Sequence, residues 1–142
     1  IIILRMDKKI LKFINRNHVS VLTTLLENGN PHSASMHYAS RENPLEFVFF
    51  TKKNSRKCKH FENNKKYPAS LVIGFDEKEM VEFQSEGKVR IANIEETKLG
   101  VKTFAKKYKG AELDEEHQVL IYEPTWWRYT EYKPKFMAIE SK

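Results

Sequence analysis

The clearest pattern along the chain is an alternation of apolar and polar residues between positions 79 and 91. Val81, Phe83, Val89 and Ile91 fall on one side of an extended chain, and charged or amide side chains fall on the other. A period of two is typical of an antiparallel strand with one buried face. This segment therefore predicts a half-buried strand.

Shorter apolar or β-branched segments indicate further strands. They lie at 19–24, 31–39, 45–51, 69–75, 119–122 and 126–132, with a short last one at 137–139. Between the first two, Asn28-Gly29 predicts a tight hairpin turn, because these residues tolerate positive φ angles. The strands follow one another in hairpins without regular βαβ alternation. We therefore predict an antiparallel barrel or curled sheet of about six or seven strands.

Helical periodicity predicts three peripheral helices. In residues 7–17, Ile10, Phe13 and Ile14 fall on one face. A second helix is predicted from Asn54 or Ser55 to about residue 64. A third begins after Asn93, with two glutamates in its first turn, and ends before Gly110. The fold class is thus mainly β with peripheral helices.

The positive charge of the chain is concentrated in one segment. The 142 residues carry a formal net charge of +6, and residues 52–66 alone contain seven Lys or Arg against Glu62. Seven minus one is six, so the remaining residues are neutral overall. Such a local basic patch favours an anion site, with a solvated basic helix face as the alternative.

Length and cysteine content limit the remaining possibilities. The chain has the size of one domain, and Cys58 is the only cysteine, which excludes an internal disulfide and favours a reducing, cytoplasmic setting. Cys58 precedes Phe61 by three residues, so we expect it to be buried. The five histidines lack metal-ligand spacing, and we expect no metal. We also expect no signal peptide, and residues 1–5 to come from an expression vector, a longer natural tail or a disordered end.

One short stretch combines the groups that bind phosphate. A predicted strand ends at Thr51, a loop follows, and a predicted helix opens at Ser55. Unpaired N–H groups at a helix N-terminus attract anions. Thr51 and Ser55 add hydroxyl donors, Arg56 a planar fork and Lys57 a point charge. These residues predict a phosphate cradle without a glycine-rich loop.

The order strand, F-F-T-x-x-x-S-R-K, helix, E-N-N resembles the phosphate-binding segment of the pyridoxamine 5′-phosphate oxidase-like FMN-binding split-barrel family. Gly29-Asn30-Pro31 upstream and Glu86-Gly87 downstream agree with this resemblance, which covers residues 10–92. It implies a single split-barrel domain over residues 1–142, FMN as cofactor, and a homodimer with the flavin between subunits.

The resemblance also implies which residues contact the cofactor. They are Ala34, Ser35, Met36, His37, Phe50, Thr51, Ser55, Arg56, Lys57, Glu82 and Gln84. The family often has Arg at the position of Ala34 and Gln at the position of Glu82, so two contacts are altered. The oxidase's C-terminal Arg-x-His pair and its Lys at the position of Ala39 are absent, which places pyridoxamine-phosphate oxidation itself in doubt.

Several functions remain open at this stage. The leading hypothesis is a small FMN-dependent oxidoreductase, with His37 as candidate proton donor or, alternatively, as a hydrogen-bonded histidine on a strand face. The others are a nucleic-acid-binding barrel, a non-catalytic flavin store or sensor, and a haem- or deazaflavin-using relative. Trp126 and Trp127 alternate on a strand, so we expect one to face in. The other either covers a flavin or a subunit contact, or is an ordinary aromatic residue of the barrel wall.

Overall fold

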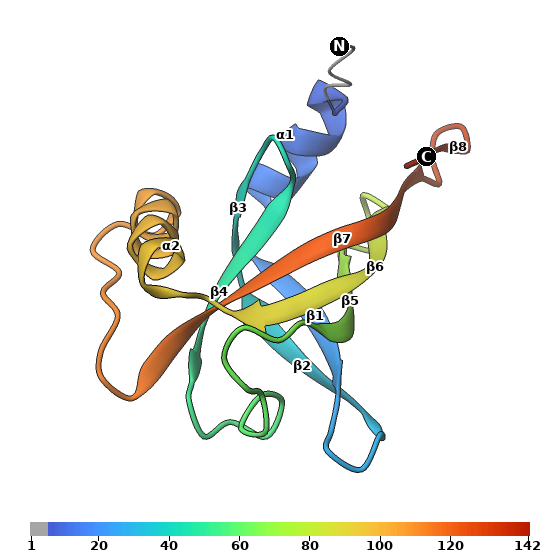
Figure 1. The fold of residues 1–142 in the computed structure, drawn as a ribbon. Helices are drawn as coiled ribbons and strands as arrows, with labels where there is room; N and C mark the ends of the chain where they lie inside the picture. Colours follow the sequence, from blue (N-terminus) through green and yellow to red (C-terminus); the bar gives the residue numbers. More distant parts are fainter. Residues whose placement is uncertain (1–5) are drawn as a thin grey trace.

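One curled antiparallel sheet organises the chain in the computed structural model, which describes residues 6–142 (Figure 1). The expectations for residues 1–5 lie outside this range. In chain order the elements are α1 (Lys8–Arg16), β1 (Val19–Leu25), β2 (Pro31–His37), β3 (Ala39–Arg41), β4 (Glu46–Lys52), β5 (Tyr67–Ile73), β6 (Val81–Ile91), α2 (Ile94–Lys107), β7 (His117–Glu131) and β8 (Met137–Glu140).

The strand order explains the barrel shape. It runs β2-β1-β5-β6-β7-β4-β3, with β8 paired to β7, and every pair is antiparallel. β2 and β4 contact each other without forming a ladder, so the wall is split between them. The predicted fold class, a mainly β split barrel with peripheral helices, is confirmed.

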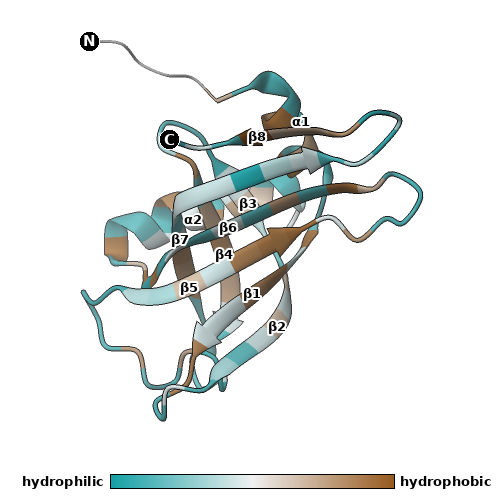
Figure 2. Cartoon of the chain, turned by 90° about the vertical axis from the view of Figure 1, so that its right-hand side faces the viewer, coloured by the Kyte–Doolittle hydropathy of each residue, from teal (hydrophilic) through white to brown (hydrophobic). Residues whose placement is uncertain are grey.

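The two helices cover different parts of the barrel. Ile10, Phe13 and Ile14 of α1 are fully or almost fully buried in the main core, as the sequence predicted. α2 lies over the outer face of β3, β4 and β7, where Phe104 packs in a second cluster with Val48. Figure 2 shows β2, β1, β5 and β6 side by side with no helix in front of them.

The predicted helix over residues 54–64 is wrong. The segment consists of turns, and within it only the bond from Lys59 N to Ser55 O has helical i→i+4 spacing. Two buried side chains, Cys58 and Phe61, tie the segment to the core, and Phe61 stacks on Tyr67 with ring centroids 4.3 Å apart. A short segment with few strong helix formers and several like charges does not overcome these tertiary contacts.

Two strand boundaries also differ from the prediction. The expected strands at 119–122 and 126–132 form one long strand, β7. Pro124, the register partner of Gly87, lies next to a β-bulge, where a proline is tolerated within a strand. The expected strand at 31–39 is divided at Tyr38 into β2 and β3. Neither helix of the described residues is long and apolar enough to cross a membrane.

Candidate functional site

Three polar side chains meet where β4 ends. Thr51 points into the barrel end and is 5% exposed. The Lys57 Nζ donates to Thr51 Oγ1 at 3.0 Å and to Ser55 Oγ at 3.2 Å, and the two hydroxyl oxygens lie 3.4 Å apart. We call Thr51, Ser55 and Lys57 the loop cluster. The structure thus brings together three of the four residues of the predicted phosphate cradle.

Buried groups hold the loop cluster from behind. Thr24 of β1 donates its hydroxyl to the Lys57 carbonyl at 3.0 Å. The Cys58 Sγ lies 3.1 Å from Ser55 Oγ, and Gln118 of β7 donates to the same sulfur at 3.7 Å. Cys58 is 1% exposed, as expected from its spacing to Phe61. The cluster is therefore positioned by residues from two strands that are distant in sequence.

The charge around the loop cluster suits a phosphate. Of the seven cations in residues 52–66, only Lys65 and Lys66 form ion pairs within the described part of the chain, with Glu62 and Glu123. Arg56 is exposed and stands next to the cluster in sequence. Because the side chains offer hydroxyl and cationic donors, the donor set fits a dianionic phosphate. The helix N-terminus expected to assist it is absent, so the fit rests on side chains.

The four candidates on β2 do not share one surface. Ala34 and Met36 point inward and pack against the main core, whereas Ser35 and His37 are exposed on the outer face. The His37 ring lies edge-on to Tyr108, with centroids 5.7 Å apart. One ligand surface therefore cannot use all four side chains.

Phe50 and Thr51, expected to act as a pair, point to opposite sides of β4. The Phe50 ring stacks on Phe104 of α2 with centroids 4.1 Å apart and an interplanar angle of 19°. Phe50 thus attaches α2 to the sheet while Thr51 serves the loop cluster. Consecutive residues of a strand alternate in direction, which separates these two roles.

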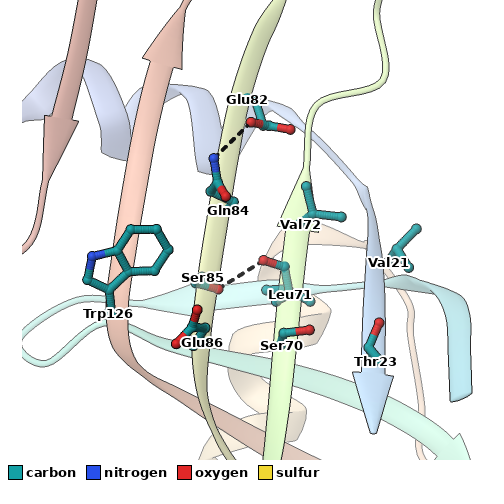
Figure 3. A pocket seen from close by; sticks show the side chains of 10 residues that line it. All are labelled: Val21, Thr23, Ser70, Leu71, Val72, Glu82, Gln84, Ser85, Glu86 and Trp126. Atoms are coloured by element: carbon teal, nitrogen blue, oxygen red, sulfur yellow. Dashed lines mark hydrogen bonds between the residues drawn. The ribbon is translucent and has the colours of Figure 1, made fainter. Parts of the chain in front are cut away.

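Glu82 and Gln84 lie on the uncovered outer face of the sheet, in a hollow of about 290 Å³ (Figure 3). Gln84 Nε2 donates to Glu82 Oε1 at 3.1 Å, and Trp126 closes one side. We call this the outer hollow. Its lining residues are Val21, Thr23, Ser70, Leu71, Val72, Glu82, Gln84, Ser85, Glu86 and Trp126.

The sequence analysis did not select the β1 and β5 residues of the outer hollow. Thr23 and Ser70 face each other across the β1–β5 ladder, and both also line an adjoining hollow of about 400 Å³ towards Lys88 and Thr125. The sequence signal that could have identified them is the alternation along each strand, which places both residues on the outward-facing side. Trp126 points outward and Trp127 packs on Phe83, which confirms the predicted alternation.

Two shifted pKa values lie at the end of α2. Burial lowers the pKa of Lys107 to about 8 and raises the pKa of Tyr108 to about 12. Lys107 donates to the Asn17 carbonyl and its Nζ lies 4.1 Å from the centre of the Tyr38 ring, while Tyr108 donates to the Tyr38 carbonyl at 2.7 Å. These contacts fasten α2 to the end of α1, so the shifts have a structural origin.

Comparison with known proteins places this geometry in context. Residues 6–131 match the model of a family described as pyridoxamine 5′-phosphate oxidase. No curated protein matches this sequence. Among solved structures, the conserved hypothetical protein Rv2991 from Mycobacterium tuberculosis is 18% identical, with a TM-score of 0.70 over 92% of this chain and 88% of that one.

Two further structures share the fold. A protein from Clostridium acetobutylicum, related to general stress protein 26 and assigned to the pyridoxinephosphate oxidase family, is 17% identical, with a TM-score of 0.68 over 96% of each chain. HutZ, the haem storage protein from Vibrio cholerae, is 12% identical, with a TM-score of 0.62 over 85% of this chain and 91% of that one. At these identities the similarity establishes the fold alone.

Proposed function

Because the chain belongs to the pyridoxamine 5′-phosphate oxidase family, we propose that it binds FMN and acts as a small flavin-dependent oxidoreductase. The observation that carries the proposal is the loop cluster, where two hydroxyls and an ammonium group converge beside an exposed arginine. FMN, when bound, supplies the electron transfer.

The residues of this chain have separate tasks in the proposal. Thr51, Ser55 and Lys57 hold the phosphate, and Arg56 swings onto it from solvent. The outer hollow, with Gln84 and Trp126, lies on the sheet face that no helix covers, and a second copy of the chain is expected to close that face. We therefore expect a homodimer with the flavin at the subunit boundary.

Proton transfer to a substrate is assigned to His37. Its ring is exposed on the outer face of β2, beside Tyr108, and histidine changes charge in the physiological pH range. Residues 126–142 contain no oxidase-type Arg-x-His pair, so we do not propose pyridoxamine phosphate as the substrate.

The absorbance spectrum of purified protein, after addition of FMN and removal of the excess, tests the proposal. We expect a retained flavin spectrum, and much weaker retention of riboflavin, which lacks the phosphate. Retention of haem with a Soret band and no flavin would favour a role like that named for HutZ. Flavin retention without turnover by any donor would favour a flavin store or sensor.

Arg56→Ala sharpens the same test. Loss of a charge-assisted phosphate contact costs about 1.5–3 kcal/mol, which corresponds to about 10- to 150-fold in FMN affinity. Equal affinities of the variant and the wild type in an FMN titration would show that Arg56 does not contact the phosphate.

A further inference from the structure

Lys57 connects two strands that are not neighbours in the ladder. Its carbonyl accepts a hydrogen bond from Thr24 of β1, and its Nζ donates to Thr51 of β4. In the strand order, β1 and β4 are separated by β5, β6 and β7 on one side and by β2, the split and the short β3 on the other. Since β2 contacts β4 across the split, Lys57 spans the end of the split in the barrel wall.

One β2 side chain is placed at this end of the split. His32 is the register partner of Thr24, and its half-exposed side chain has the inward parity of Ala34 and Met36. Side chains directly opposite each other in an antiparallel pair have Cβ atoms about 4.5–5.5 Å apart. His32 therefore lies beside the threonine that holds Lys57. Figure 1 shows the loop that follows β4 at the same end of the barrel as the β1–β2 turn.

We propose that His32 is the β2 member of the anion site, a further phosphate-binding side chain whose protonation strengthens binding. The inference rests on the proposed function only in identifying the bound anion as the phosphate group of FMN. The loop cluster approaches the phosphate from β4 and its loop, and His32 approaches it from the opposite side of the split.

The charged groups around this end of β2 set the direction of the pH effect. The loop brings Arg56 and Lys57, the end of β4 brings Lys52, and the β1–β2 turn brings Glu27, which forms no ion pair within residues 6–142. A bound phosphate favours the charged imidazole, because a dianion close to the ring stabilises its positive charge. Phosphate binding therefore couples to proton uptake by His32 as the pH falls from 8 to 6.

The test compares the FMN dissociation constants of wild type and His32→Asn at pH 6 and pH 8. A phosphate monoester also takes up a proton near pH 6, but this affects both proteins equally and cancels in their ratio. We expect His32→Asn to bind about ten-fold more weakly at pH 6 and within about two-fold at pH 8. His32→Arg, charged at both pH values, should restore affinity and make the ratio independent of pH.

His18→Asn is the matched control, because His18 lies beside Tyr108 at the other end of β1. A ratio near one for His32→Asn at both pH values, with wild type still binding FMN, would overturn the role of His32 and leave the proposed function standing.

Inorganic phosphate separates the two proposals further. In a titration followed by the NMR signals of the histidine rings, we expect the His32 resonances to move and those of His18 to stay. Movement of His32 in a protein that does not bind FMN would support the anion site and reject the flavin. An unmoved His32 ring at saturating phosphate would overturn the inference.

Discussion

The loop cluster is supported by the inward side of β1, whereas the outer hollow is lined by the outward side of the same strand. Thr24 points inward and supports Lys57, whereas its neighbour Thr23 points outward and lines the hollow. The cluster presents hydroxyl and cationic donors, and the hollow presents the carboxylates of Glu82 and Glu86 beside an indole. A ligand with a phosphate at one end and an uncharged ring at the other would be oriented by this separation of charge.

The two regions also differ in how firmly they are built. Each side chain of the loop cluster bonds another member or a buried group. In the outer hollow the carboxylate–amide contact between Glu82 and Gln84 is the one side-chain bond between two outward-facing residues of its lining, within the described chain. Preorganised donors lose less entropy on binding, so we expect the phosphate end to dominate affinity and the hollow to adjust it.

Lys57→Ala should show the largest effect, because it removes the ammonium group that joins Thr51 to Ser55. We expect FMN affinity to fall by about 10- to 150-fold, measured by fluorescence titration, with little change for riboflavin. The control is Lys59→Ala, an exposed lysine of the same loop without an ion pair among the described residues. Equal losses for the two variants would mean that net charge, and not the cluster's geometry, attracts the anion.

Thr24→Val should have an intermediate effect. Valine keeps the shape but leaves the Lys57 carbonyl without its donor, at a cost to folding stability of about 1–3 kcal/mol. We also expect a several-fold loss of FMN affinity, and recovery of both quantities in Thr24→Ser. Denaturant unfolding and FMN titration measure them.

Thr130→Val is the matched control for Thr24, since both threonines are 1% exposed and Thr130 lies on β7. If Thr130→Val weakened FMN binding as much as Thr24→Val, general destabilisation would explain the loss and the support of Lys57 by β1 would be rejected.

Local sequence signals predicted α1 and α2, the two helices whose N-terminal residues cap the helix. α2 carries a capping box in which Asn93 and Glu96 bond each other's backbone N–H groups, and α1 begins after Asp7, whose side chain accepts from Lys9 N. The segment at Ser55 has a similar capping residue, but its conformation is decided by the burial of Cys58 and Phe61. That burial depends on strands elsewhere in the chain, so local propensity could not reveal it.

The sequence predicted several residues of the candidate site, but not the directions in which their side chains point. The S-R-K segment led to Ser55 and Lys57, which do converge. The bond from Thr24 to Lys57 joins residues 33 positions apart, and the contact from Gln118 to Cys58 joins residues 60 apart. Such pairs depend on the strand order. The opposite directions of Phe50 and Thr51 follow from strand parity, which fixes two faces without saying which of them a ligand uses.

Glu82→Gln should show the smallest effect and tests whether the two regions hold one ligand. Removing a carboxylate from the outer hollow reduces repulsion towards the FMN phosphate and, after reduction, towards the anionic flavin ring. At moderate distance and partial exposure we expect about two- to five-fold tighter FMN binding and a reduction potential higher by about 10–20 mV. Glu95→Gln, on the exposed side of α2 with a side chain 84% exposed, is the control and should change neither value. A potential that stays constant in Glu82→Gln, while Lys57→Ala still weakens binding, would place the flavin ring outside the outer hollow and separate the two regions.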